Sequence, residues 1–534
     1  MYDVIIIGSG AAGLSAALSA KEKNSKTLVI SKTQPTHSQT VQAQGGINAV
    51  LYEDKDSIEQ HVADTYNASK EISSKDNINF MCSNAKDTIN WLDEIGVPFN
   101  RDKENKISQR KFGGTKKIRT CYSSDYTGLK ILHTLFDQCI KNKIEFLNEH
   151  ILLDLIVEDK ICKGVVILDI LSGEIKEIYS KSIILATGGY AGIYQNFTTN
   201  SYSNTADGIA IALRAGAKLS NMEFVQFHPT ALVNSNILIS ESARGEGGYL
   251  VDKDGNRFID ELKARDEVAR AIYTRITNKE SVYLDLRHLG LKKINDLMPQ
   301  ERRLALEFSN VKLEEELLPI NPAAHYTMGG IKTNINGQTN IKNLYACGEC
   351  AQANIHGANR LGGNSLLEIV TLGKHIGNYA SKNINNETIV QDNDSNKLEL
   401  IKEEINNIFQ YKNEINLYKC KDEVGQILFD KAGLFKDKNS LNEALKQINE
   451  IKNSLDEIGV VDKQKEYNKN LLEFLEFRNI IDIALVVIES ALNREESRGS
   501  HYRVDYPNID VSYLKNSKAI QEENKVSCSF EDVV

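Results

Sequence analysis

The 534-residue sequence contains no long apolar stretch and no recognisable targeting segment. Its N-terminal apolar run, Val4–Ile7, is far shorter than the roughly 18 uninterrupted apolar residues of a membrane span. The run is also too short for the apolar core of a secretory signal. We therefore expect a cytoplasmic protein that does not insert into a membrane by itself.

An excess of positive charge is also missing. The chain carries 73 acidic and 64 basic residues, which give a formal net charge of -9. Proteins that bind nucleic acid usually present basic surfaces, because phosphate contacts supply much of their affinity. We expect no nucleic-acid partner, although a local cleft of basic side chains remains compatible with a small anion.

Cysteine pairs at metal-binding spacing are nearly absent. The eight cysteines are scattered, as expected for reduced cytosolic thiols, and only Cys347 and Cys350 form a CxxC pair. A zinc or iron–sulfur site needs a second such pair. A loop with two small residues is therefore the favoured interpretation, and no metal site is expected. Iron–sulfur and haem motifs are absent as well, so electrons for any redox reaction must come from another protein.

A nucleotide-binding pattern is present at the N-terminus. The run YDVIII (2–7) predicts a buried parallel strand, and GSGAAG (8–13) follows it directly. A helix is expected over 14–23 and a second strand over 27–30. In this context the first glycine forms a tight turn, the second lets the backbone approach a pyrophosphate, and the third lets the helix pack on the strand. The helix N-terminus then offers free N–H groups to phosphate.

The acidic residue that usually ends the second strand of an NAD site is missing. Ser31 and Lys32 stand in its place, which favours FAD over NAD. The loop 35–50 is rich in small and amide residues, and its Gly45-Gly46 pair suits close approach of a flat ring. A strand over 182–187 followed by two glycines is typical of a chain that returns beneath the cofactor.

Length and composition indicate several domains. A chain of 534 residues is too long for one ordinary core, so two or three domains are expected. The segment 385–396 is polar and asparagine-rich, which predicts a linker. Beyond it, 397–409, 439–457 and 468–493 have helical spacing and predict a separate helical domain. The stretch 502–534 is expected to be an irregular tail.

Polar side chains gather in the stretch 228–265. Cationic and hydrogen-bonding groups at this density suit a small dianion better than a hydrophobic core, since carboxylates prefer charge-assisted donors. Two more such groups follow downstream. The members are His228, Ser240, Glu241, Arg244 and Arg265, then His325 and Arg360.

Eight motifs, taken in order, resemble those of the fumarate reductase/succinate dehydrogenase flavoprotein family, whose superfamily includes L-aspartate oxidase. They are GSGAAG, TVQAQGGI, FHPTAL, RGEGGYL, HYTMGGI, LYACGE, HGANRLGGNSLLE and NREESRGSHYRVDYP. The resemblance implies an α/β fold with a Rossmann-like FAD-binding domain, an inserted α+β capping domain and a C-terminal helical domain. The implied boundaries are 1–227 with 326–384 for the FAD-binding domain, 228–325 for the cap, 397–500 for the helical domain and 501–534 for the tail.

The resemblance also implies roles for individual residues. Flavin N5 would exchange hydride with one carbon of fumarate or succinate, while Arg265 transfers the proton at the other. Glu241 and Arg244 would relay protons to Arg265, because a free guanidinium is a poor acid. The implied dicarboxylate-binding residues are His228, Ser240, His325 and Arg360. The implied FAD-binding residues are Gly8, Gly10, Ala12, Gly13, Ser31, Lys32, Gln39, Thr40, Gln44, Gly45, Gly46, Thr187, Gly188, Asp207, Glu349, Arg360, Ser365 and Leu366.

One departure concerns how FAD is held. Many respiratory members of the family attach FAD covalently to a histidine, but the matching position here is Gln39, and His37 lies two residues earlier. We therefore expect non-covalent FAD. A covalent flavin–histidine bond generally raises the flavin potential, so its loss would affect succinate oxidation more than fumarate reduction.

Two other functions remain as alternatives. L-aspartate oxidases place a glutamate where this chain has Phe112, and that glutamate meets the substrate ammonium; an apolar residue there favours fumarate or succinate. The tail 510–534 also resembles the reductase subunits, whereas ALVNSNILISE, PAAHYT and SIEQHVADT are oxidase-like. The second alternative is a flavin-bearing electron-transfer subunit without catalysis of its own. The intact set of polar residues counts against it.

The resemblance finally implies partners. An iron–sulfur subunit is the expected source of electrons, within a complex that reaches quinone or another donor. The chain would then be cytoplasmic, or peripheral on the cytoplasmic side of the inner membrane through its partner subunits.

Overall fold

A parallel sheet carries the N-terminal half in the computed structural model, which describes residues 1–384, 396–522 and 525–533. Its strands follow the order β6, β2, β1, β9 and β16, and neighbouring strands are parallel. The apolar residues of β1 are buried on both faces, as expected for a central parallel strand. The strands are β1 (Tyr2–Ile7), β2 (Thr27–Ser31), β6 (Glu145–Asn148), β9 (Ile175–Leu185) and β16 (Leu344–Ala346).

Strand β9 has an antiparallel neighbour along its first half and a parallel neighbour along its second half. Its first half pairs antiparallel with β8 (Ile161–Asp169), which pairs with β7 (His150–Glu158). Its second half pairs parallel with β1, from Ser180 to Leu185. Strands β8 and β9 thus form an antiparallel hairpin. The separately predicted strand 182–187 is the continuation of the same long strand.

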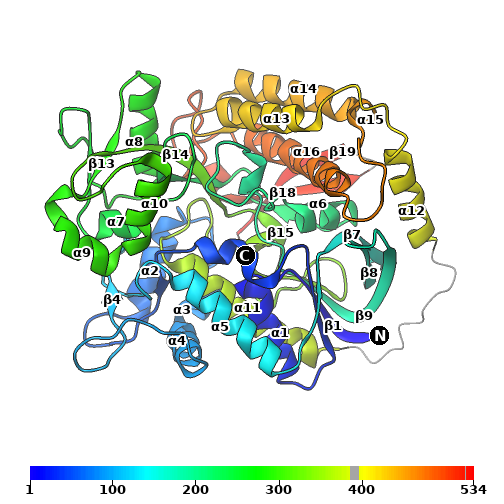
Figure 1. The fold of residues 1–534 in the computed structure, drawn as a ribbon, viewed down its shortest axis with the longest axis horizontal. Coiled ribbons are helices and arrows are strands. Elements are labelled where there is room, and N and C mark those ends of the chain that lie inside the picture. Colours follow the sequence, from blue (N-terminus) through cyan, green and yellow to red (C-terminus); the bar gives the residue numbers. More distant parts are fainter. Residues whose placement is uncertain (385–395, 523–524, 534) are drawn as a thin grey trace.

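Three helices pack together against this sheet (Figure 1). They are α1 (Ala11–Lys21), α5 (Thr127–Lys141) and α11 (Asn364–Lys382). A Cβ on Gly377 would lie 2.2 Å from the backbone oxygen of Ala16, so glycines of α11 allow the axes of α11 and α1 to approach closely. Helix α1 begins three residues before the predicted start, because the glycine turn leads directly into it.

The rest of the FAD-binding part consists of short elements. A three-stranded sheet has the order β3-β5-β4, and a five-stranded sheet has the order β17-β15-β10-β18-β19. The elements are β3 (Ile47–Asn48), β4 (Gln109–Arg110), β5 (Thr120–Cys121), β10 (Leu219–Ser220), β15 (Gly330–Lys332), β17 (Ala351–Gln352), α2 (Ile58–Ala68), α3 (Lys75–Ser83), α4 (Ala85–Glu94) and α6 (Asp207–Arg214).

An inserted unit, here called the cap, lies at the left of Figure 1 in green. The chain enters it through β11 and leaves it through β14, which are antiparallel partners. The expected boundaries at 227/228 and 325/326 fall inside these two strands. The cap has a hydrophobic cluster of its own, which includes Val268, Ile272 and Leu284. Its elements are β11 (Val225–Leu232), α7 (Glu241–Gly245), β12 (Tyr249–Val251), α8 (Arg265–Thr277), β13 (Tyr283–Asp285), α9 (Gly290–Leu297), α10 (Pro299–Ser309) and β14 (Leu318–Thr327).

The C-terminal helices extend the sequence prediction. Besides the predicted helices there is α13, whose residues Val424 and Leu428 are buried. Gly425 stands inside α13 because a Cβ there would lie 2.2 Å from the oxygen of Gln195. The helices share one hydrophobic cluster with β7, β8, β9 and α6. They are α12 (Lys397–Ile408), α13 (Leu417–Ala432), α14 (Lys438–Asn453), α15 (Leu455–Ile458) and α16 (Lys469–Asn493). The predicted linker 385–396 lies outside the described residues, apart from Asn396.

The prediction of an irregular tail is wrong for two stretches of it. Strands β18 (Lys515–Glu522) and β19 (Lys525–Asp532) form an antiparallel hairpin. Strand β18 pairs with β10, for example Ala519 with Leu219. An exposed strand edge needs a partner for its backbone groups, and the hairpin supplies it to β10. No helix in the described parts of the chain combines the length and apolar content needed to cross a membrane.

Candidate active site

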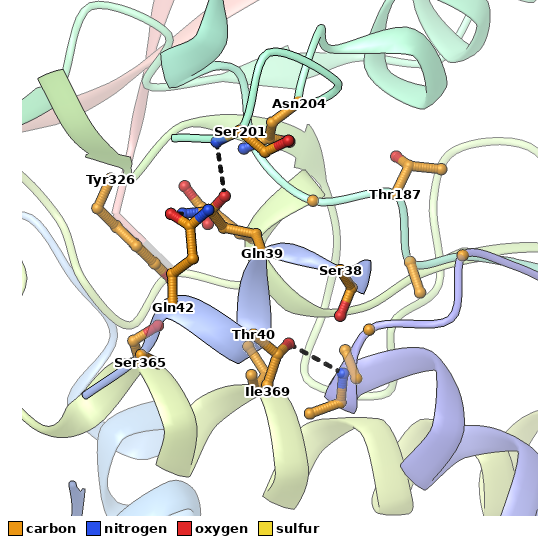
Figure 2. A pocket seen from close by; sticks show the side chains of 18 of the residues that line it. Ser38, Gln39, Thr40, Gln42, Thr187, Ser201, Asn204, Tyr326, Ser365 and Ile369 are labelled. Atoms are coloured by element: carbon orange, nitrogen blue, oxygen red, sulfur yellow. Dashed lines mark hydrogen bonds between the residues drawn. The ribbon is translucent and has the colours of Figure 1, made fainter. Parts of the chain in front are cut away.

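One cavity unites the nucleotide pattern with the two polar clusters. The glycine turn after β1, the loop 35–46, the start of α11 and side chains of the cap all line it, and it encloses about 1670 Å³ of space, including the part open to solvent. A cavity lined by both the glycine turn and the cap suits a dinucleotide with a small second ligand. Every residue predicted for the site lines the cavity except Gly13 and Arg244. Figure 2 shows part of this wall.

The glycine turn fits a bound pyrophosphate. Gly8 has φ +113°, and a Cβ there would lie 2.2 Å from the oxygen of Ala186. A Cβ on Gly13 would lie 2.0 Å from the oxygen of Gly8, so Gly13 serves the packing of α1 on β1 and does not line the cavity. The first turn of α1 has no acidic side chain and forms part of the wall. Its partial positive charge is therefore available to an anion, which supports FAD as the occupant.

Lys32 forms a buried ion-pair cluster at the same end. Its Nζ lies 2.6 Å from Asp207 Oδ2 and 2.7 Å from Glu476 Oε1 of α16. Burial alone would lower the pKa of Lys32, but the two carboxylates raise it above its usual value. Lys32 is therefore cationic, and it ties the nucleotide end of the cavity to the C-terminal helices. Glu476 was not among the predicted site residues.

The loop 35–46 is held by hydrogen bonds on both sides. Thr40 Oγ1 accepts from the backbone N–H of Ala11 at 3.2 Å, at the start of α1. The amide of Gln39 accepts from the backbone N–H of Ser201 at 2.9 Å and donates to Gln42 Oε1 at 3.1 Å (Figure 2). Both Gln39 and His37 line the cavity. The position that carries histidine in many relatives is thus occupied by an amide engaged with the protein.

Two arginines and a carboxylate meet at the cap side of the cavity. Arg265 donates to Glu241 Oε2 from Nε at 2.8 Å, and its Nη2 lies 2.6 Å from the same oxygen. Burial alone would raise the pKa of Glu241, but Arg265 and Arg244 hold it below its usual value. Glu241 is therefore an anion beside Arg265, in the arrangement that a proton relay requires.

Gln226 connects the two arginines and was missed from the sequence. Its Oε1 accepts from Arg265 Nη1 at 3.0 Å and from Arg360 Nη2 at 3.3 Å. Its Nε2 donates to the backbone oxygen of Arg360 at 2.9 Å. Gln226 lies two residues before His228 in β11, and the period of two along a strand is the signal that could have identified it.

Arg244 has a different environment from Arg265. It donates from Nη1 to the backbone oxygen of Glu261 at 2.6 Å. Its Nε and Nη2 are buried and have no hydrogen-bond partner among the described residues. The positive charge of Arg244 also contributes to the low pKa of the Glu241 carboxyl. Arg244 does not line the cavity, and it acts on Glu241 through its charge.

Uncharged side chains that can donate hydrogen bonds line the rest of the cap side of the cavity. Burial, followed by the charge of Arg265, lowers the pKa of His228 and of His325 well below the usual value. His228 Nδ1 lies 3.2 Å from the backbone nitrogen of Thr230 and 3.3 Å from both the carbonyl and the hydroxyl oxygen of the same residue. Ser240 Oγ accepts from the N–H of Ser242 at 3.2 Å, which leaves its own hydrogen free to donate.

Arg360 supplies a charged donor to the same space. Its guanidinium lies 4.1 Å above the ring of Tyr326, and its Nε is buried without a hydrogen-bond partner within the described residues. Burial, followed by the charge of Arg265, lowers its pKa to about 10, so it remains a cation near neutral pH. An unpaired buried cation calls for an anionic ligand, because a charge left alone in the interior is unfavourable.

Glu241 is enclosed by glycines from the FAD-binding part. A Cβ on Gly113 would lie 2.2 Å from Glu241 Oε1, and one on Gly362 would lie 2.6 Å from Oε2. Phe112 is buried, lines the cavity and lies close to Gly45 and Gly362. The wall that would face a substrate substituent at this point is therefore apolar.

Other lining residues were not among the predicted site residues, although Gln42 and Tyr326 lie within the quoted motifs. Ser38, Gln42, Ser201, Asn204 and Tyr326 contribute to the wall in Figure 2. Ser201 and Asn204 belong to the segment 198–205, which has no regular secondary structure and no motif. Only its contacts with the loop 35–46 and with β14 bring it to the cavity.

Comparison with known proteins gives a consistent result. A family model for the FAD binding domain matches residues 3–366, and one described as fumarate reductase flavoprotein C-term matches residues 421–534. The 8-methylmenaquinol:fumarate reductase flavoprotein subunit of Wolinella succinogenes is 39% identical, over 100% of this chain and 90% of the relative. The succinate dehydrogenase flavoprotein subunit of Rickettsia bellii is 37% identical, over 100% and 95%. A solved quinol fumarate reductase chain of E. coli superposes with a TM-score of 0.95, at 33% identity, over 100% of this chain and 96% of that one.

Proposed function

The chain belongs to the family of fumarate reductase and succinate dehydrogenase flavoproteins, and on that basis we propose that it interconverts fumarate and succinate with bound FAD. The observation that carries the proposal is the unpaired, buried Arg360 in a cavity that also contains the Arg265–Glu241 pair. A C4 dicarboxylate supplies the negative charge that Arg360 lacks.

The binding of a dicarboxylate uses donors from both parts of the protein. Arg360 pairs with one carboxylate, and its planar fork suits two parallel hydrogen bonds. His228, Ser240 and His325 donate to the remaining carboxylate oxygens from the cap side. Two of these donors are neutral imidazoles, so they add hydrogen bonds without adding charge. Phe112 closes the site and disfavours a substrate with an ammonium group.

Arg265 is the proposed proton donor to the substrate. When bound and reduced, FAD would supply the hydride for one alkene carbon of fumarate. Arg265 would donate a proton to the other alkene carbon, which gives succinate. Arg265 would then regain a proton through Glu241, which is ionised at rest and must first accept a proton; its carboxylate already contacts Nε and Nη2 of Arg265. Arg244 would supply that proton to Glu241. The relay explains how a guanidinium with a high pKa can act as an acid, since it is held against the carbon and resupplied at once.

The substrate is tested by two assays on the purified, FAD-loaded chain. With a reduced viologen as electron donor, fumarate is expected to be reduced at a rate typical of enzymes, on the order of 1–1,000 per second. With oxygen as acceptor, L-aspartate is expected to give no turnover. Turnover of aspartate alone would establish the oxidase instead. Failure of both reactions, with FAD bound, would favour an electron-transfer subunit.

We propose that FAD is held without a covalent bond. Gln39 has no nucleophilic nitrogen, and its amide is engaged with Ser201 and Gln42. Precipitation of the protein in acid is expected to release all of the yellow colour into the supernatant. Colour retained in the pellet would contradict this, and a His37→Ala variant would then show whether His37 is the attachment point.

Further subunits follow from the same proposal. Reduction of fumarate consumes electrons, and we infer that an iron–sulfur subunit donates them. Such a subunit would place the chain in the cytoplasm or peripherally on the cytoplasmic side of the inner membrane. The proposed units are 1–227 with 326–384 for FAD, 228–325 for the cap, 397–500 for the helices and 501–534 for the tail.

A further inference from the structure

A hydroxyl outside the cavity touches one of the dicarboxylate donors. Thr199 Oγ1 lies 2.7 Å from His325 Nδ1; Thr199 is buried and His325 is partly buried. Thr199 does not line the cavity, and none of the roles assigned above requires it. From this contact we infer that Thr199 is a positioning residue that fixes the tautomer of His325 and thereby the affinity for dicarboxylate; the inference rests on the proposed function.

The direction of this hydrogen bond follows from the distances. The hydroxyl of Thr199 has one hydrogen to donate, and its two acceptors are His325 Nδ1 at 2.7 Å and the carbonyl oxygen of Ala324 at 3.5 Å. The shorter contact receives the hydrogen, since O–H···O hydrogen bonds usually span about 2.5–3.0 Å and the contact with Ala324 is longer than that. Nδ1 is therefore an acceptor, and the hydrogen of the neutral ring resides on Nε2.

The position of that hydrogen decides whether His325 attracts or repels the substrate. A carboxylate only accepts hydrogen bonds, so a ring with hydrogen on Nε2 donates to it. The other tautomer would present a lone pair to the carboxylate oxygen. His325 does not become a cation instead, because burial and the charges of Arg265 and Arg360 lower its pKa well below the usual value. One hydroxyl thus converts a repulsive contact into a favourable one.

Hydrogen bonds to the backbone of β14 hold Thr199 next to His325. The N–H of Thr199 donates to the oxygen of Ala324 at 2.9 Å, and the side chain of Asn200 donates to the oxygen of His325 at 2.7 Å. The segment 198–200 therefore lies along the end of β14. The geometry of the Thr199–His325 bond is set by these backbone contacts and does not depend on a mobile side chain.

The test uses the FAD-loaded chain with succinate as the calorimetric ligand and fumarate as the substrate. Thr199→Val keeps the shape and removes the hydroxyl; it is expected to weaken succinate binding and raise KM for fumarate about tenfold, with kcat changed less than threefold. Thr199→Ser is expected to restore both constants to within twofold. Thr198→Val is the matched control, because Thr198 is also buried and bonds only to backbone groups.

A double substitution separates this role from a purely structural one. In a His325→Ala background, Thr199→Val is expected to change succinate binding less than twofold, because the hydroxyl then has no ring to orient. If the tenfold loss persisted there, or if Thr199→Val matched the wild type, the inference would be wrong. If the wild-type protein neither bound succinate nor reduced fumarate, the proposed function would fail and this inference with it.

Discussion

Replacing Arg265 with glutamine is expected to lower kcat for fumarate reduction about a thousandfold while FAD stays bound. The size follows from the loss of a positioned general acid, which typically contributes 10²–10⁴-fold. Glutamine can still donate a hydrogen bond to Glu241, but it has no proton to transfer at carbon. KM for fumarate is expected to change less than kcat, because Arg360 supplies the charge that binds the substrate.

Reduced-viologen assays at saturating fumarate measure the effect, and the visible absorbance of the flavin reports FAD content. Arg275→Gln is the matched control: Arg275 lies on the same helix α8 and pairs with Glu280 near the surface, away from the cavity. It should leave kcat within twofold. An Arg265→Gln chain that retained full activity would exclude Arg265 as the acid and would reopen the question of which group protonates the substrate.

Adding a methyl group at Gly113 is expected to lower kcat about a hundredfold without removing any polar group. A Cβ on Gly113 would lie 2.2 Å from Glu241 Oε1 and 3.4 Å from Cδ. The carboxylate cannot yield freely, because its other oxygen is held by Arg265 at 2.6 Å. Displacement of the pair by about 1 Å is enough for a hundredfold loss. Gly362→Ala is expected to act in the same direction from the Oε2 side, where its Cβ would lie 2.6 Å away.

Steady-state kinetics and thermal melting together test this prediction. Gly255→Ala is the control, since a Cβ there meets open space in an exposed turn of the cap. Its φ of +84° makes alanine strained, so it should lose about 1 kcal/mol of stability but no activity. If Gly113→Ala behaved like Gly255→Ala, with stability reduced and kcat unchanged, the close approach to Glu241 would have no catalytic consequence.

Local patterns predicted much of the fold correctly. Strand β1, the glycine turn and α1 follow from residues within a few positions of one another, and the structure confirms them. Helix α13 was missed although Val424 and Leu428 have helical spacing, because Gly425 and several lysines interrupt the pattern. The hairpin β18–β19 was missed because its strands are polar and half exposed. Their pairing depends on the edge of β10, almost 300 residues earlier in the chain.

The candidate site was likewise predicted only in part from the sequence. The sequence by itself determined which chemical groups are available: a glycine turn for phosphate, and histidines, arginines and a carboxylate within motifs that resemble those of one family. Only the tertiary structure decided how those groups are connected. Gln226 joins Arg265 to Arg360, and Glu476 joins Lys32 from the opposite end of the chain. Such contacts depend on the packing of the cap and the C-terminal helices, which no local pattern of residues encodes.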